Sequence, residues 1–135
     1  MISLDVENLF PSIPLNETLE YATGILFKLF GTKINKNVIL KLLEFCTKDV
    51  TFKFGDIYYQ QINGVQMGSP LSPLLTELYL VKFENEKLNF ANLNFNIKFF
   101  YRYVDDIFAI VDKNIDGQQL LTKVNKLDKN LKFTI

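Results

Sequence analysis

The sequence has no histidine and no tryptophan, and it has only one cysteine, Cys46, and one arginine, Arg102. Without histidine, the chain cannot use a histidine as an acid–base catalyst or as a metal ligand. Aspartate and glutamate must therefore supply any metal site, which favours hard cations such as Mg²⁺ over Zn²⁺. A single cysteine cannot form an internal disulfide, so we expect a reducing, intracellular setting in the nucleus or the cytoplasm.

The sequence also lacks a secretory signal and an apolar run that suits a membrane. Its longest uncharged stretch, Ile57 to Thr76, contains glutamines, glycines and two prolines, so it is not expected to span a bilayer. The 15 basic and 15 acidic residues balance to a net charge of zero. Because a self-sufficient nucleic-acid binder usually has a basic surplus, the charge alone argues against that role.

What is present is a globular composition: 135 residues with 48% hydrophobic content predict one domain with one core. The predicted order is strand, two helices, two strands, helix, two strands, helix and strand. This is an α+β pattern with an antiparallel sheet packed on helices. The expected elements are a strand at Ile2–Val6, helices from Asn16 to Phe30 and from Lys36 to Thr47, a hairpin around Gly55-Asp56, a helix ending at Leu88, a hairpin from Ile97 to Val111, a helix over Gln118–Lys129 and a strand at Leu131–Ile135.

Local signals refine the helices. Asn16 is expected to cap the first helix, and Gly31 to end it. The second helix has one apolar face, in which Cys46 is interpreted as a core residue. Ser69-Pro70 and Ser72-Pro73 each suit an N-cap followed by the first helical position. The members of the apolar face are Val38, Ile39, Leu42, Leu43 and Cys46.

Two adjacent aspartates, Asp105 and Asp106, lie between apolar runs in the stretch FFYRYVDDIFAI. At ~4 Å, two carboxylates repel by about 1 kcal/mol in water and by ~4 kcal/mol at an effective dielectric near 20. A partly dry hairpin therefore disfavours the pair unless a cation joins them or one stays protonated. A third carboxylate, Asp5, ends the first apolar strand and meets Asp105 at one sheet edge if that strand lies beside the hairpin. Three such carboxylates suit a pair of Mg²⁺ ions, with Asp105 as a ligand and Asp106 as a supporting carboxylate.

The alternative is an ordinary solvated turn, because aspartate is a common turn residue. Asp5 alone is equally ambiguous as a carboxylate at the end of a strand. The metal site is favoured because both carboxylate positions lie at the ends of apolar strands and because the glycine-rich loop at 63–73 points to the same chemistry.

The stretches LDVENLF, NGVQMGSPLSP and YRYVDDIF occur in an order and spacing that resemble motifs A, B and C of reverse transcriptases. The form is most similar to the Penelope-like retroelements, and the resemblance covers nearly the whole chain. It implies a reverse-transcriptase palm over residues 1–135, with motifs A, B and C and part of motif D. It also implies an RNA-directed DNA polymerase that joins dNTPs to a DNA primer on an RNA template, with two Mg²⁺ ions as cofactors, for which Mn²⁺ can substitute.

The resemblance also implies roles for individual residues. Asp5, Asp105 and Asp106 match the catalytic carboxylates, and the Val6 carbonyl matches the backbone metal ligand. Phe10 matches the bulky residue under the incoming sugar, where an aromatic ring excludes a 2′-hydroxyl and so selects deoxynucleotides. The alternative for Phe10 is a plain core side chain.

Other residues match the nucleic-acid contacts of the family. The loop that passes the nascent base pair corresponds to Gly68, Ser69 and Pro70, and Gln66 is expected to contact template or nucleotide. Tyr103 is expected to support the primer end, whereas Arg102 either contacts a phosphate or lies in solvent. Three lysines, Lys123, Lys126 and Lys129, form a helical stripe that is interpreted as a solvated face. Lys132, near motif D, is a candidate to protonate pyrophosphate.

The sequence departs from the family pattern at both ends. The fingers region that precedes motif A, and the primer grip and thumb that follow this stretch, are missing, so we expect an incomplete palm. Two functions stay open: a reverse-transcriptase palm, or a catalytically inactive remnant that at most binds nucleic acid or a partner. A nucleotide cyclase lacks support, because its glycine- and acid-rich turn is replaced by YVDD.

Overall fold

The computed structural model describes residues 1–88 and 97–135 of the chain. These residues divide into two compact units. Unit 1 contains Met1–Leu9 and Leu80–Ile135, and unit 2 contains Phe10–Tyr79. The two units are described separately below.

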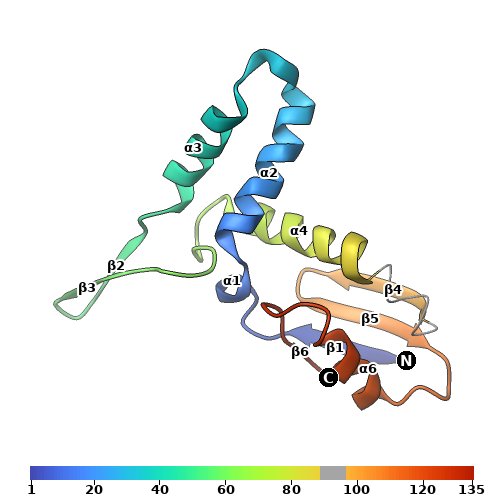
Figure 1. The fold of residues 1–135 in the computed structure, drawn as a ribbon. Coiled ribbons are helices and arrows are strands. Elements are labelled where there is room, and N and C mark those ends of the chain that lie inside the picture. The colour runs from blue at the N-terminus through green and yellow to red at the C-terminus, as the bar shows by residue number, and fades with distance from the viewer. Residues whose placement is uncertain (89–96) are drawn as a thin grey trace. The chain divides into compact units, whose positions relative to one another are not determined.

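Unit 1 is built on a four-stranded sheet with the strand order β4-β5-β1-β6 (Figure 1). The strands are β1 (Ile2–Val6), β4 (Ile97–Tyr103), β5 (Asp106–Val111) and β6 (Phe133–Thr134). All three strand pairs are antiparallel. The first strand of the chain, β1, lies between the β4–β5 hairpin and the last strand, β6. The antiparallel sheet of the α+β prediction is therefore confirmed.

Side chains alternate across this sheet, as the strand geometry requires. On one face Leu4, Val6, Ile107 and Ala109 are buried, whereas Ser3 and Asp5 on the opposite face are exposed. The buried face packs with α6 (Gly117–Val124), which contributes Leu120 and Val124 to the core. The rings of Phe83 and Phe133 stack at 5.6 Å between centroids. One face of the sheet is thus closed by a core, and the other faces solvent.

Unit 2 contains a pair of helices followed by a small hairpin. In chain order its elements are α1 (Leu9–Ser12, which begins in unit 1), α2 (Leu15–Phe30), η1 (Gly31–Lys33), α3 (Lys36–Thr47), β2 (Thr51–Phe54), β3 (Ile57–Gln60) and the first part of α4 (Ser72–Phe83). The turn at Gly55-Asp56 joins β2 and β3, which pair from Thr51↔Gln60 to Phe54↔Ile57. The predicted hairpin is confirmed.

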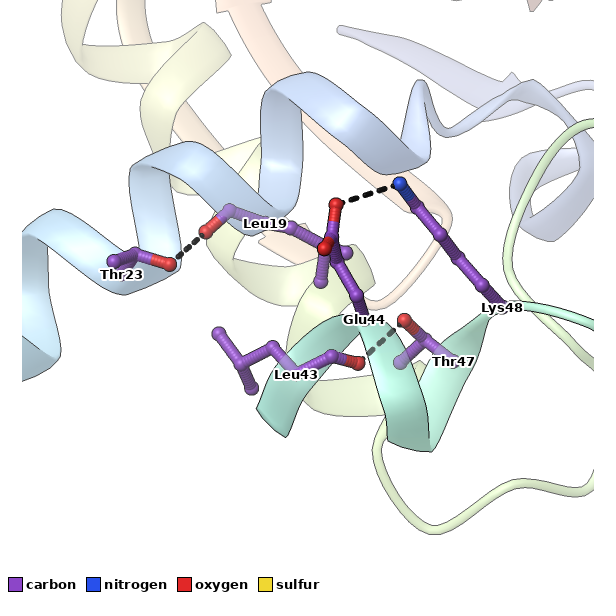
Figure 2. A network of polar contacts seen from close by, with 6 residues as sticks. All are labelled: Leu19, Thr23, Leu43, Glu44, Thr47 and Lys48. Carbon is purple, nitrogen blue, oxygen red and sulfur yellow. Dashed lines mark hydrogen bonds and ion pairs between the residues drawn. The ribbon is translucent and has the colours of Figure 1, made fainter. Parts of the chain in front are cut away.

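Threonine hydroxyls in α2 and α3 bond to their own helices (Figure 2). Thr23 Oγ1 donates to the Leu19 carbonyl at 2.7 Å, and Thr47 Oγ1 donates to the Leu43 carbonyl at the same distance. Thr23 is only 1% exposed, so this bond satisfies a hydroxyl that burial would otherwise leave without a partner. Near the end of α3, Lys48 Nζ pairs with Glu44 at 2.7 Å.

Several helix ends differ from the prediction. The residue before α2 is Pro14, so Asn16 lies inside the first turn and does not cap the helix. The helix predicted over Gln118–Lys129 ends at Val124, so Lys126 and Lys129 lie beyond it and the lysines do not form a helical stripe. All three of these lysines are nevertheless exposed, as a solvated face requires. The strand predicted over Leu131–Ile135 is reduced to Phe133–Thr134.

The interpretation of Cys46 as a core residue is wrong, because Cys46 is exposed. The rest of the apolar face of α3 is also largely uncovered in unit 2: Val38 and Leu42 are exposed, Leu43 is half-buried, and only Ile39 is buried. A 3.6-residue period identifies an apolar face but does not say what covers it.

The helix predicted to reach Leu88 does so in two parts. The regular α4 ends at Phe83, and the chain continues as a π-helical turn, η2 (Glu84–Leu88). Among residues 1–88 and 97–135, none of the helices combines the length and the apolar character that crossing a bilayer would need.

Candidate active site

The two predicted carboxylate positions come together in the sheet of unit 1. β1 pairs with β5 in the register Ile2↔Ala109, Ser3↔Phe108 and Leu4↔Ile107. One further step along this antiparallel register brings Asp5 level with Asp106. Because residues opposite each other on neighbouring strands share a face, both aspartates belong to the open face of the sheet. Both are exposed, which agrees with that placement.

Asp105 occupies the turn that joins β4 and β5. Tyr103 pairs with Asp106, so Val104 and Asp105 form a two-residue connection. Val104 has a φ of 56°, a value that β-branched residues rarely adopt. Such a conformation costs about 1–3 kcal/mol and persists only where the surrounding structure holds it. Asp105 is half-buried, whereas Asp106 at the start of β5 is exposed.

These carboxylates are the candidate site for the divalent cations that the sequence predicts. Carboxylate oxygens are the donors that Mg²⁺ prefers, and Asp5, Asp105 and Asp106 lie at the same end of two paired strands. Within the part of the chain that the structure describes, however, no three ligand-type side chains are grouped closely enough to hold a metal ion. The donor chemistry fits Mg²⁺, and the side chains would have to turn toward one another to bind it. Asp106 is the residue level with Asp5, so the assignment of Asp105 as the ligand and Asp106 as its support stays a prediction.

Arg102 lies on β4, immediately before the turn residues. Its side chain is 7% exposed, so the alternative that it lies in solvent is wrong. Nε donates to Glu84 Oε1 at 2.5 Å, and Nη1 donates to the Val104 carbonyl at 3.0 Å. A phosphate contact by Arg102 stays a prediction. Tyr103, the predicted support for the primer end, is exposed on the open face opposite Asp106.

Phe10 belongs to unit 2, where it forms part of α1 and is half-buried. Its carbonyl accepts a hydrogen bond from the Val65 amide at 3.0 Å. The preceding residue, Gly64, has a φ of +78°, and a Cβ added there would lie 2.6 Å from Pro11 Cα and 2.7 Å from the Phe10 carbonyl oxygen. Only glycine allows this backbone approach. The main chain of Gly64 and Val65 therefore directly contacts the backbone of Phe10 and Pro11.

The predictions from sequence missed Gly64 and Glu84, and only one of the two had a local signal. Asn63-Gly64 is a turn dipeptide that marks a residue with positive φ. Glu84 has no such signal, because its partner Arg102 lies 18 residues further along the chain.

The loop after Gly64 contains the other predicted nucleotide contacts. Gly68 has a φ of +92°, a backbone conformation that favours glycine. In the described structure no atom lies within 4 Å of an added Cβ, so the preference comes from the backbone and not from a close neighbour. Ser69 precedes α4, and its carbonyl accepts from the Ser72 amide at 3.1 Å. The helix begins at Ser72, so Ser72 and Pro73 are its first two residues and Ser72 is not the residue that caps it. Ser69 lies in the turn before the helix, where its Oγ accepts from the Leu71 amide at 3.4 Å. Gln66 and Ser69 line one small hollow together with Val65, Ser72 and Leu75.

The predicted site residues are divided between the units. The predicted metal ligands and Tyr103 belong to unit 1, whereas the predicted nucleotide contacts Phe10, Gln66, Gly68, Ser69 and Pro70 belong to unit 2. The stretch LDVENLF crosses the boundary, because Asp5 belongs to unit 1 and Phe10 to unit 2.

This sheet, with a carboxylate on its central strand and two more at an adjacent hairpin turn, defines a palm-type polymerase fold. The family whose model matches residues 1–135 is described as reverse transcriptase (RNA-dependent DNA polymerase). The chain therefore belongs to the reverse transcriptase family. No curated protein matches the sequence.

Solved structures support the same fold. One match is described as apo telomerase from Candida tropicalis truncated from its C-terminal domain. The TM-score is 0.67 at 19% sequence identity, over 98% of this chain and 29% of the telomerase chain. The chain thus spans less than a third of the length of this structural relative, which shares its fold.

Proposed function

We propose that residues 1–135 are the palm of a reverse transcriptase encoded by a Penelope-like retroelement, and that it functions inside the cell. Its reaction is the addition of dNTPs to the 3′-hydroxyl of a DNA primer on an RNA template. The family match over residues 1–135 supports the reaction class, and the stretches DVENLF and MGSPLSP support the Penelope-like subtype. The observation that carries the proposal is the pairing of β1 with β5, which brings Asp5 level with the YVDD turn.

The carboxylates of Asp5, Asp105 and Asp106, with the Val6 carbonyl, would hold two Mg²⁺ ions, for which Mn²⁺ can substitute. Such a pair of ions, when bound, lowers the pKa of a primer hydroxyl and neutralises charge on the phosphates. The open face of the sheet suits this role, because exposed carboxylates there reach both a cation and a polyanionic substrate. The absence of histidine agrees with a reaction that needs no protein nucleophile.

The remaining predicted residues would select and position the substrates. The ring of Phe10 would lie under the sugar and exclude a 2′-hydroxyl. The loop of Gln66, Gly68, Ser69 and Pro70 would contact the nascent base pair, and exposed Tyr103 would support the primer end. In these roles the side chains bind and orient substrates and take no part in a covalent step.

Primer extension tests this proposal. The full polypeptide that contains residues 1–135 is expected to extend a DNA primer on an RNA template with dNTPs and Mg²⁺. Asp105→Asn should abolish extension, because it removes a carboxylate charge at the site. The matched control is Asp112→Asn, since Asp112 follows the other end of β5 and pairs with Lys98. Full activity of Asp105→Asn would refute the assignment, whereas loss in both variants would point to a folding defect.

A second candidate is a catalytically inactive remnant that at most binds nucleic acid or a partner. It is favoured by the lack, among the described residues, of three ligand-type side chains grouped for a metal ion. Primer extension by the 135-residue chain alone separates the two candidates for this piece of sequence. We expect no extension by that chain, and robust processive synthesis would contradict this expectation.

A further inference from the structure

The environment of Arg102 differs from that of the other cations in the ion pairs of the described structure. Its side chain is 7% exposed, whereas the paired lysines are between 38% and 72% exposed. In the β4–β5 register, Arg102 lies opposite Ile107, a core residue. The guanidinium is thus directed to the covered face of the sheet, away from the open face of Asp5 and Asp106. A charge in such a place is tolerated only with a partner and hydrogen bonds.

The partners of Arg102 join two separate elements of unit 1. Nε bonds Glu84, the first residue of the π-helical turn η2, and Nη1 bonds the carbonyl of Val104 in the β4–β5 turn. A planar guanidinium can make both bonds at once with fixed geometry. A lysine ammonium carries all its donors on one nitrogen, so it cannot reproduce the two separated bonds that the guanidinium makes from Nε and Nη1. This accounts for one arginine in a chain whose other cationic side chains are all lysines.

The residue whose carbonyl Arg102 holds is the strained one. Val104 has a φ of 56°, and Asp105 and Asp106 follow it directly. Residues in such sparsely populated conformations relax unless their surroundings hold them. Relaxation of Val104 would re-aim the next two peptide units, and with them both carboxylates of the turn. The hydrogen bond from Arg102 opposes this relaxation, and Glu84 fixes the orientation of the guanidinium.

We propose that Glu84 and Arg102 are positioning residues that hold the Val104-Asp105 turn and thereby fix the direction of the Asp105 and Asp106 carboxylates. We call this pair the turn clamp. The catalytic part of the inference rests on the proposed function, whereas the structural part does not.

The structural part is tested by hydrogen–deuterium exchange of the 135-residue chain without added metal. Arg102→Lys keeps the charge and loses the fork, and Glu84→Gln keeps a hydrogen-bond acceptor and loses the charge. Because bonds to charged groups are among the stronger ones, we expect amide exchange across residues 103–106 to rise at least about tenfold in Arg102→Lys and less in Glu84→Gln. The matched control is Lys98→Gln, which breaks an exposed pair elsewhere on β4 and should leave this exchange unchanged. Unchanged exchange in both clamp variants would overturn the proposal.

The catalytic part is tested by steady-state primer extension with the same variants in the full polypeptide. Misdirected carboxylates should lower kcat about tenfold or more while the KM for dNTP changes less than about threefold, because the predicted nucleotide contacts belong to unit 2. Faster exchange with an unchanged kcat would overturn the catalytic role. If far-UV circular dichroism shows that Arg102→Lys does not fold, the amide exchange of residues 103–106 and the kcat are measured in Glu84→Gln instead. If the unsubstituted protein makes no DNA, the proposed function fails, and the exchange experiment still decides whether the clamp exists.

Discussion

Because Gly64 has no Cβ, its loop can approach the backbone of Phe10 closely. A Cβ added to Gly64 would lie within 2.8 Å of the Pro11 backbone and of the Phe10 carbonyl oxygen. The adjacent Val65 amide bonds the same carbonyl. Any side chain at Gly64 therefore pushes on the residue that we expect to contact the sugar.

We expect Gly64→Ala to lower the free energy of unfolding by about 2–4 kcal/mol. This combines the cost of a positive φ in alanine with that of overpacking against rigid backbone. The measurement is chemical denaturation of both proteins, and a loss below about 1 kcal/mol would show that the loop moves aside freely.

Gly24 is the matched control for this substitution. It lies inside α2 with nothing within 4 Å of an added Cβ, and its φ is in the ordinary range. Gly24→Ala should therefore stabilise the protein by about 0.5–1 kcal/mol, because alanine favours the helix. Opposite signs for the two substitutions would separate the local clash from a general intolerance of alanine.

At the scale of elements, the sequence predicted most strands and helices and misplaced several of their ends. The two hairpins were predicted correctly, because turn residues between alternating apolar runs are a local signal. The last helix was predicted too long, because its end depends on distant atoms. Asn125 follows Val124 and bonds both the amide and the carbonyl of Phe133, at 2.7 and 3.1 Å. No local pattern reveals a bond across eight residues of irregular chain.

In the candidate site, too, the sequence predicts residues that have a local signal and misses residues whose roles depend on distant contacts. The acidic residues could be predicted because like charges between apolar strands are unusual. Their register could not, since the pairing of β1 with β5 brings Asp106, not Asp105, level with Asp5. The groups that hold them could not be predicted. Glu84 and Gly64 are ordinary in sequence, and their roles arise only where distant segments meet.

The segment after α6 is tied to η2 by an ion pair that can be tested. The side chain of Asp128 is 1% exposed. Its carboxylate accepts a hydrogen bond from Lys87 Nζ at 2.6 Å and another from the Asn130 amide at 2.8 Å. Asp128→Ala should cost about 2–3 kcal/mol of unfolding free energy, because it removes charge-assisted bonds in a buried place. Lys98→Gln should cost less than about 0.5 kcal/mol, since its pair is largely exposed. Thermal or urea unfolding measures both, and equal losses would contradict the special weight given to Asp128.

At the scale of the whole molecule, acidic and basic side chains balance over the whole chain and also within each of the two units. Unit 1 and unit 2 each contain as many acidic as basic side chains. Neither unit therefore has the basic surplus with which proteins neutralise phosphates. The carboxylates of the open face add local negative potential that a cation would have to offset before a nucleic acid could approach.

We therefore expect the 135-residue chain to bind a primer–template duplex more weakly than about 10⁻⁴ M at physiological salt, with a shallow dependence on salt. Fluorescence anisotropy with a labelled RNA–DNA duplex at low and at physiological salt measures both quantities. Micromolar binding that falls steeply with added salt would contradict this and would indicate a cationic surface that the charge count hides.

The small hairpin of unit 2 has a consequence for handling the protein. Phe54, Ile57 and Tyr58 are exposed, and in the described structure β2 and β3 pair only with each other. Each strand thus presents an open edge with apolar side chains, which is the arrangement that recruits further strands into aggregates. Lys53 and Asp56 near its tip are the charges that oppose such growth. Loss of solubility at high concentration should therefore begin at this ribbon, and Ile57→Lys is the substitution that should delay it.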